Sequence, residues 1–540
     1  KEVSRYRSFG KLDDPTAEEG DRGFIGMNSY LEPSTLEPGF VEDSQNMRLE
    51  GDTAKVRKGI EFKAGSVTLS YGTDKVFTSI LFSDPATNAE FIAVATKNKV
   101  IIWNDQNNSG IDIAYPGGQV VAAGDNASFV QAAEKLILFR GPSKTPLEWN
   151  GDYTSPTAFT VKANGSPGAG NIACPNTTFG VFFANRLLIP QPADSPFTVL
   201  ASEILDTDNY KESTSQFRLS KGSASGGIVA ITSYLENQAI IFQRNSIFLI
   251  NNIALTSSAA TFEITRQFGC VARKSVAASG PQIYFLSDDG VMVLQQGLDA
   301  AKGLGISVAK VSGEAVPMTR PIQDQIDQAN FANADKAVGV TFDNKYYLAY
   351  PGTPTSTTND KCIVFDILQN NFSSIDSFPS GFAIDDFVII DHGTNPTKRR
   401  LFACNDKGWH LVEEAATDIT GTIGSGTTTS TAISAKLKTR SFTLGDMNVK
   451  SWKRGQLGVK VNNGDAFTIK YNTTDPDRTN TVHTESYSGS EEEKLIRFGS
   501  ARSRGFACGI EVDVTAGSPE IRHVSVEGIK TGLMGRHEVA

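Results

Sequence analysis

The chain has 540 residues, of which 39% are hydrophobic and 21% are charged, and its formal net charge is −9. This length is too great for one compact core, so we expect two or three domains. The acidic balance argues against a protein that holds DNA tightly, because such binding needs clustered positive charge. It is compatible with a passage along which DNA slides without sticking.

The composition favours an all-β chain rich in turns, because glycine is plentiful (49 residues) and long helix-like periodic stretches are missing. The five cysteines are far apart and include no C-x-x-C pair, which predicts buried free thiols and assembly in a reducing cytoplasm. The first residues lack the apolar region of a signal peptide. No run approaches the ~20 apolar residues that a membrane span needs, so we expect no membrane span.

Residues 1–65 are predicted to form an extended N-terminal arm. Between Ile25 and Phe62, Pro33 and Pro38 and three glycines mark bends, and a basic clip, Lys55-Val56-Arg57-Lys58, follows. The stretch contains no nucleophile–base pair and no metal-ligand spacing. It has the pattern of an arm that pairs with a larger body.

Residues 66–416 repeat one pattern, in which a short apolar strand, a tight polar turn and a second apolar strand follow one another. Asn, Asp and Gly at most of the turns tolerate the positive φ that short hairpins need. Many short hairpins at a spacing of about 40–50 residues are typical of a β-propeller, and we expect six or seven blades. The seven turns lie near residues 97, 134, 185, 244, 288, 343 and 406.

Three further segments complete the predicted layout. Residues 317–335 carry helical periodicity and predict a short helix inserted between blades. Residues 417–431 are rich in Gly, Thr and Ser and are predicted to be a linker. Residues 432–540 alternate apolar and polar side chains, as half-buried antiparallel strands do, which predicts a small β-sandwich or barrel platform. The arm is expected to pair with this platform.

No catalytic constellation is evident, so we predict a protein that is not an enzyme and has no cofactor and no metal site. The five histidines show no ligand spacing, and no G-x-S-x-G or phosphate-binding loop is present. Glycosidases need two carboxylates that face one cavity. Asp288-Asp289 and Asp385-Asp386 are adjacent pairs, and adjacent strand residues point to opposite faces. Asp475-x-Asp477 lacks the central Gly and the Glu of a calcium loop.

The arm also resembles a known family. The order Asn28, Pro33, Leu36-x-Pro38-Gly39, Asn46-Met47-Arg48, Gly51 and Arg57-Lys58-Gly59 is similar to the opening of phage tail nozzle proteins. This family includes tail tubular protein B and the packaged-DNA-stabilisation proteins of short-tailed phages. A second passage, Gln267 to Ser275 followed by residues 283–291, resembles an internal passage of the same family. The likeness covers these passages and the general layout only.

The resemblance implies a structural protein of the virion tail, assembled in the host cytoplasm. Six copies would form a ring below the adaptor protein, retain the packaged genome, conduct double-stranded DNA through the lumen and dock tail fibres or spikes. The candidate subunit or adaptor contacts are Phe24, Tyr30, Pro33, Leu36, Pro38, Phe40, Arg48, Arg57 and Lys58, together with the C-terminal strands. The candidate DNA-channel contacts are Lys398, Arg399 and Arg400.

Two alternatives remain open at this point. A receptor- or glycan-binding tail or spike protein would present aromatic residues at one mouth of the propeller. A cellular propeller scaffold would share the fold without the phage-like passages. The sequence assigns no gate residues and no host.

Overall fold

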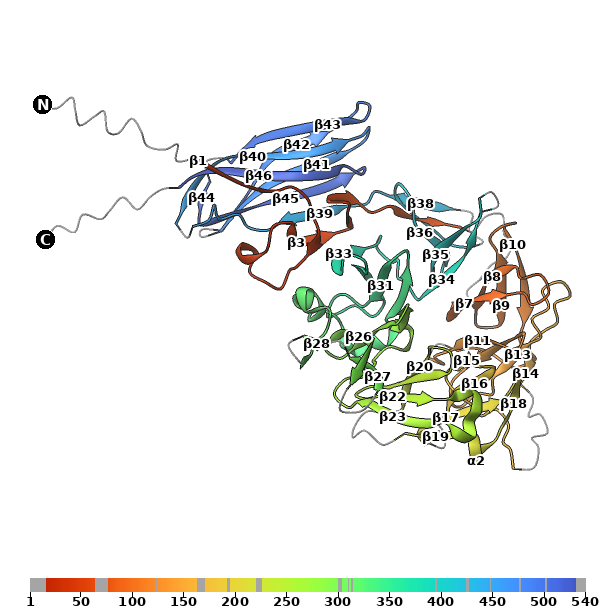
Figure 1. The fold of residues 1–540 in the computed structure, drawn as a ribbon. Helices are drawn as coiled ribbons and strands as arrows, with labels where there is room; N and C mark the ends of the chain where they lie inside the picture. Colours follow the sequence, from red (N-terminus) through yellow and green to blue (C-terminus); the bar gives the residue numbers. More distant parts are fainter. Residues whose placement is uncertain are drawn as a thin grey trace, which may run out of the picture.

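The computed structural model describes residues 16–63, 76–122, 124–162, 170–191, 195–219, 226–299, 304–308, 310–311, 314–393, 396–423, 427–446, 448–474, 477–500 and 503–530. Nearly all of its regular structure is β-strand, arranged as a propeller and a two-sheet platform (Figure 1). The predicted all-β class, with a β-propeller of six or seven blades, is confirmed. Within the described ranges, no helix is long and apolar enough to cross a membrane.

Six blades are each built from four consecutive antiparallel strands. Blade one contains β7 (Thr78–Ser83), β8 (Glu90–Ala95), β9 (Lys99–Asn104) and β10 (Ser109–Ala114), and blade two contains β11 (Ser128–Ala132), β12 (Lys135–Phe139), β13 (Leu147–Trp149) and β14 (Thr160–Val161). Blade three contains β15 (Val181–Phe183), β16 (Arg186–Gln191), β17 (Ser195–Glu203) and β18 (Asp206–Tyr210), with α2 (Glu212–Ser215) and β19 (Gln216–Arg218) beside β17.

The series continues around the ring. Blade four contains β20 (Ile228–Tyr234), β21 (Gln238–Gln243), β22 (Ile247–Asn251) and β23 (Ala260–Thr265), with η2 (Ile253–Ser258) between the last two. Blade five contains β24 (Ala277–Ser279), β25 (Gln282–Ser287), β26 (Gly290–Asp299) and β27 (Leu304–Val308), preceded by η3 (Arg273–Ser275) and followed by the pair β28 (Lys310–Val311) and β29 (Glu314–Ala315). Blade six contains β30 (Val338–Phe342), β31 (Lys345–Tyr350), β32 (Lys361–Asp366) and β33 (Asn371–Ser377).

A seventh blade takes its fourth strand from the arm. β34 (Asp386–His392), β35 (Lys398–Asn405) and β36 (Gly408–Ala415) are consecutive, and β6 (Gly59–Phe62) pairs antiparallel with β36. The innermost strand β34 also packs against β7 of blade one, which closes the ring. The predicted division between the arm (residues 1–65) and the propeller (residues 66–416) is therefore corrected. β6 lies in the first range but is a strand of the propeller.

The apolar runs of the blades follow from this stacking, since both faces of each sheet are covered by neighbours. In β8, Ile92 and Val94 pack in one core with Trp409 of blade seven. Phe91 and Ala93, which point to the other face, pack in a second core with blade two. Burial on both faces explains why these strands are apolar throughout instead of alternating.

The platform is a sandwich of two sheets. One sheet has the order β4-β5-β46-β40-β43, and the other includes β3-β39-β45-β41-β42. The arm supplies several of these strands, and β1 also pairs with β46. The strands are β1 (Thr16–Asp21), β3 (Phe40–Gln45), β4 (Met47–Glu50), β5 (Thr53–Val56), β39 (Ala435–Thr439), β40 (Lys450–Val461), β41 (Ala466–Thr474), β42 (Arg478–Ser486), β43 (Glu492–Gly499), β44 (Arg504–Gly505), β45 (Ala507–Ala516) and β46 (Glu520–Lys530).

The arm joins the propeller to the platform. β3, together with the short β2 (Gly26–Met27), lies between β33 of blade six and β39 of the platform, so that one ten-stranded sheet runs from the blade into the platform. Figure 1 shows these arm segments in red between the green blades and the blue platform. One continuous apolar core includes Met27 of the arm, Phe365 of blade six and Phe467 of the platform.

Two predicted segments differ from expectation. The Gly/Thr/Ser-rich stretch 417–431 contains a β-hairpin, β37 (Asp418–Gly421) and β38 (Thr428–Thr431), which extends the sheet of blade seven beside β6. The predicted helix at 317–335 is a series of short turns: η4 (Arg320–Ile322), α3 (Gln323–Ile326) and η5 (Phe331–Lys336). A further turn, η1 (Pro33–Thr35), lies in the arm. The five cysteines are free thiols, four of them buried.

Candidate functional site

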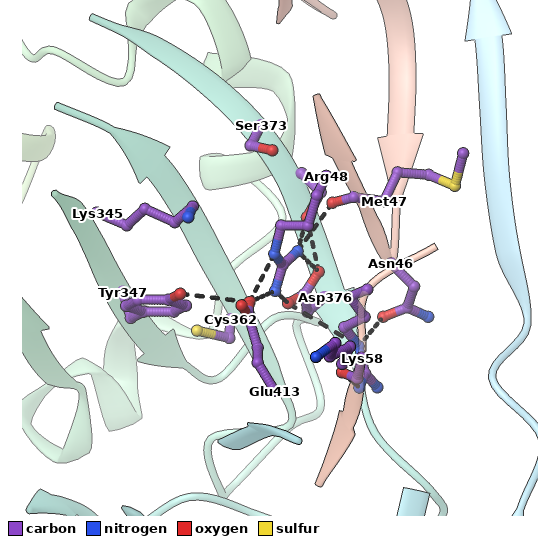
Figure 2. A network of polar contacts seen from close by, with 12 residues as sticks. Asn46, Met47, Arg48, Lys58, Lys345, Tyr347, Cys362, Ser373, Asp376 and Glu413 are labelled. Atoms are coloured by element: carbon purple, nitrogen blue, oxygen red, sulfur yellow. Dashed lines mark hydrogen bonds and ion pairs between the residues drawn. The ribbon is translucent and has the colours of Figure 1, made fainter. Parts of the chain in front are cut away.

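Arg48, from the Asn46-Met47-Arg48 part of the arm, lies in a buried polar network (Figure 2). Its guanidinium donates to both carboxylate oxygens of Asp376 at 3.0 and 2.6 Å, and its Nε donates to Glu413 at 2.6 Å. Burial alone would raise the pKa of Asp376, but the charge and hydrogen bonds of Arg48 outweigh it and hold that pKa below its usual value. Arg48 therefore fastens β4 to blades six and seven.

Arg57 makes the second half of the network. It donates two hydrogen bonds to the carboxylate of Asp418, at 2.8 and 2.7 Å, and its Nε donates to Oδ1 of Asn46 at 3.0 Å. Asn46 in turn donates to the carbonyl of Ser434 at 2.7 Å and accepts from the backbone of Ser377 at 2.9 Å. The motif residues thus connect the arm with blade six, the hairpin after blade seven and the start of the platform.

This geometry corrects part of the predicted contact set. Phe24, Leu36, Arg48 and Arg57 are 0, 5, 7 and 3% exposed, because they pack or form ion pairs within the chain. They hold the arm in place and are not surface contacts. Tyr30, Pro38 and Lys58 are exposed, and Pro33 and Phe40 are half-buried.

The predicted DNA contacts lie at one end of β35, in blade seven. Lys398 and Arg399 are exposed, and Arg400 is half-buried. Arg399 pairs with Glu90 at 2.5 Å and with Asp391 at 3.4 Å, and Arg400 lies 3.6 Å from Glu414. The carboxylates offset much of the positive charge of this cluster. None of the three residues lines the central cavity described next.

The central cavity lies where the innermost strands of the blades begin, and its volume is about 710 Å³. The chain enters each blade at this mouth, so residues far apart in the sequence meet there. Every blade contributes at least one lining residue, among them Phe77, Ala127, Phe179, Ile228, Arg273, Lys336 and Asp385. The lining combines apolar side chains with cations and carboxylates, and a concave surface of this composition is a candidate ligand site.

Two cations of the cavity differ in their partners. Lys274 forms an ion pair with Asp386 at 2.7 Å. Its neighbour Arg273 lies over the ring of Phe179, with 5.1 Å from Cζ to the ring centroid, and donates one long hydrogen bond of 3.4 Å to the carbonyl of Thr178. Burial lowers the pKa of Arg273 to about 10, so it remains charged at neutral pH. Arg273 is not among the site residues predicted from the sequence, although it lies in the passage Gln267 to Ser275.

Asp385 faces the same cavity. Its pKa is raised to about 6, first by burial, which the charge of Lys274 opposes, and also by the nearby carboxylates Asp386 and Asp406. Asp386 is held by Lys274, so the two adjacent carboxylates have different surroundings. A carboxyl group that titrates near neutrality inside a cavity is a candidate hydrogen-bonding group for a ligand.

Two exposed apolar surfaces lie elsewhere on the molecule. The arm groove, of about 820 Å³, lies between the arm and blades five and six, and its apolar lining includes Tyr30, Leu31, Phe40, Val316, Pro317 and Met318. Tyr30 and Leu31 are 50 and 48% exposed. Arg320 lies 5.9 Å from the ring centroid of Tyr30.

The second surface, the tip patch, consists of Ile204, Leu205, Leu235 and Leu255, each 56–60% exposed. These residues lie on neighbouring turns of blades three and four, which are tied together by a hydrogen bond from Arg186 to the carbonyl of Ala254. Leu205 and Leu235 have φ values of 56° and 49°, a conformation that is unfavourable for leucine. In Figure 1 these blades lie at the end of the propeller away from the platform.

No group of three or more His, Cys, Asp or Glu side chains that could hold a metal ion is found among the described residues. Of the carboxylates weighed for glycoside hydrolysis, Asp288 pairs with Arg244 at 2.7 Å. The prediction that the protein is not an enzyme stays a prediction.

Comparisons with known proteins give no family. No family model matches the chain, and no curated protein matches it. Solved structures share the propeller only remotely. The WD40 β-propeller domain of Doa1 is 10% identical, with a TM-score of 0.38 over 66% of this chain and 96% of that chain. The extracellular domain of BT4673 from B. thetaiotaomicron is 10% identical, with a TM-score of 0.40 over 86% of this chain and 60% of that chain. These values carry no functional argument.

Proposed function

We propose that the chain is a structural subunit of the tail nozzle of a short-tailed phage. In this proposal, copies form a ring that extends the DNA channel below the adaptor, retains the packaged genome and conducts it on ejection. The sequence resemblance to this family supports the proposal. The buried network gives its motif residues a physical role, because Asn46, Arg48 and Arg57 join arm, propeller and platform into one body.

The observation that carries the ring is the presence of two unlike apolar surfaces on one chain. Head-to-tail rings need two different, complementary surfaces, whereas a two-fold dimer needs one self-complementary surface. The arm groove is concave and the tip patch consists of projecting turns. Exposed apolar groups of this kind mark interaction sites on soluble proteins.

Charge supports the same pairing. Glu203 and Glu236 flank the tip patch, and Arg320 flanks the arm groove. In the described ranges, none of these three side chains forms an ion pair within its own chain at 4.0 Å or less. We therefore assign the tip patch of one copy to the arm groove of the next, which refines the predicted role of Tyr30 and Phe40.

The test is end-on electron microscopy of the full chain, together with its mass in solution. Six-fold rings are expected from the wild type. The double variant Leu205→Asp/Leu235→Asp should remain monomeric, while Val161→Asp, which changes an exposed apolar residue of blade two, should still form rings. Rings that persist in the double variant would contradict the assigned interface.

Exchanging the charges of Arg320 and Glu236 tests whether these two residues meet across the interface. Arg320→Glu and Glu236→Arg should each weaken assembly, and the two together should restore it, because the pair is re-formed with opposite signs. Single chains or three-fold spikes from the wild type would overturn the nozzle proposal. They would favour the receptor- or glycan-binding alternative.

A further inference from the structure

The central cavity contains an arginine, Arg273, that forms no ion pair with any carboxylate of the described residues. The charge of Asp386 acts on Arg273 from farther away, and Asp386 is itself paired with Lys274. Arg48, Arg57 and Arg440 each pair with a buried aspartate. Around Arg273, by contrast, no carboxylate oxygen of the described residues lies within 4.0 Å. A guanidinium in a recess is a preferred partner for a planar anion such as a carboxylate, which it binds through two parallel hydrogen bonds.

Other arginines without a carboxylate partner are satisfied differently. Arg140 and Arg186 donate short hydrogen bonds of 2.6 Å to backbone carbonyls. Among the described residues, the hydrogen bond of the Arg273 side chain is the long one to the carbonyl of Thr178. Its planar group is held against Phe179. The guanidinium is therefore held at the wall of the cavity, and its other N–H groups can donate to a ligand.

The rest of the lining restricts the class of ligand. Asp335, Asp385 and Asp406 provide carboxylate oxygens that accept hydrogen bonds from hydroxyl groups, and the half-buried Phe77 provides an apolar ring. Lys336 also lines the cavity, but its amino group donates to Asn333 and to the carbonyl of Thr357. A bare anion would therefore be repelled by the carboxylates of the lining. A saccharide with a carboxylate satisfies all three features, since its acid group faces the arginine, its hydroxyls face the aspartates and its C–H faces pack on phenylalanine. The cavity volume of about 710 Å³ suits a short oligosaccharide.

We infer that the central cavity is a binding site for an acidic saccharide whose carboxylate pairs with Arg273 and whose hydroxyls donate to Asp385 and its neighbours. The site does not depend on ring formation, because every lining residue comes from one chain. It gives the chain a recognition function in addition to the proposed structural one.

The test is isothermal titration calorimetry of the full chain, once with trigalacturonate and once with maltotriose, a neutral trisaccharide. Trigalacturonate should bind at least about tenfold more tightly than maltotriose, because the charged hydrogen bonds are lost with the neutral sugar. Arg273→Gln should weaken binding by at least about tenfold, and Arg273→Lys by less, since a lysine keeps the charge but not the planar fork. Arg244→Gln is the matched control, because Arg244 is half-exposed and lies outside the cavity. Its binding should be unchanged.

A second measurement needs no variant. On the wild type, trigalacturonate should protect Arg273 from modification by phenylglyoxal, read by peptide mass spectrometry, while Arg244 remains reactive. Absence of binding up to about 10 mM, a concentration that corresponds to negligible affinity, would overturn the inference. So would displacement by equimolar inorganic phosphate, which would indicate a site for any anion, or modification of Arg273 that trigalacturonate does not slow.

Discussion

The guanidinium of Arg57 donates two hydrogen bonds, of 2.8 and 2.7 Å, to the carboxylate of Asp418, which lies 361 residues later in the chain. Both side chains are almost completely buried, at 2 and 4% exposure. Asp418 also accepts a hydrogen bond from the backbone N–H of Ile60 in the strand that closes the propeller. One ion pair therefore fixes the arm, the closing strand and the hairpin after blade seven.

Removing one partner of this pair should be strongly destabilising. Arg57→Ala leaves the carboxylate of Asp418 buried without its charge partner, and we expect a loss of about 3–5 kcal/mol in the free energy of unfolding, measured in urea. Arg454→Ala is the matched control, since Arg454 pairs with Glu527 at 2.6 Å but is 60% exposed. Arg454→Ala should lower the free energy of unfolding by less than about 1 kcal/mol. Equal losses in the two variants would contradict the role assigned to Arg57.

Gly59 should not tolerate a side chain. A Cβ at Gly59 would lie 2.0 Å from the carbonyl oxygen of Thr417, so Gly59→Ala must push β6 away from residues 417 and 418, where the hairpin after blade seven begins. We expect a loss of about 1–3 kcal/mol or more in unfolding free energy. Gly117→Ala is the control, because nothing lies within 4 Å of its Cβ position. If both variants unfold at the same urea concentration, β6 is not tightly held.

His410 should make the protein sensitive to acid. Burial lowers the pKa of His410 to about 3, against 6.5 for an ordinary histidine, and the ring packs between Phe62 and Phe382. The unfolded chain binds a proton below pH 6.5 and the folded chain does not. Stability from this group is therefore present above pH 6.5 and is lost as the pH falls towards 3, at about 1.4 kcal/mol per pH unit.

The variant His410→Leu tests this dependence. Urea unfolding between pH 7.5 and pH 4 should show a shallower loss of stability with acid than in the wild type, because one titrating group is removed. The two proteins should have parallel pH dependences above about pH 7, where neither state binds the proton. An unchanged slope between pH 6 and pH 4 would contradict the buried neutral state.

Leu235 should be replaceable with a gain in stability. Its φ of 49° is costly for leucine, by about 1–2 kcal/mol, and asparagine adopts this conformation more readily. Leu235→Asn should therefore raise the free energy of unfolding of the dilute monomer by about 0.5–1 kcal/mol. The control is Leu255→Asn, which removes an equally exposed side chain at an ordinary φ of −116°. A gain in both variants would point to lost apolar exposure and not to backbone strain.

The hairpins could be predicted because the two apolar strands and the polar turn of each hairpin are adjacent in the sequence. Each of the seven predicted turns lies in a different blade, so the sequence pattern marked every blade once. In blades two, three and six the predicted turn connects the first and second strands, and in the other blades it connects the second and third strands. The spacing between predicted turns is irregular for this reason. Short outer strands such as β14 (Thr160–Val161) carry too few residues to show a period.

The long-range pairings could not be predicted in the same way. Nothing local to Gly59 indicates that it pairs with Ala415, and nothing local to Arg57 indicates Asp418. The charged clip was therefore interpreted as a surface contact. Arg273 could not be predicted for a similar reason. The cavity is lined by residues at the start of seven different blades, so no single segment of the sequence contains the site.

Closure by β6 sets an order of events during synthesis. This strand leaves the ribosome early, but its partner β36 follows only after roughly 350 further residues, which takes about 20–70 s at typical elongation rates. Until then blade seven is incomplete and the arm has no sheet to join. The nascent propeller therefore spends that interval as an open arc with unprotected edges, a state in which chaperone capture or premature association between chains competes with correct folding.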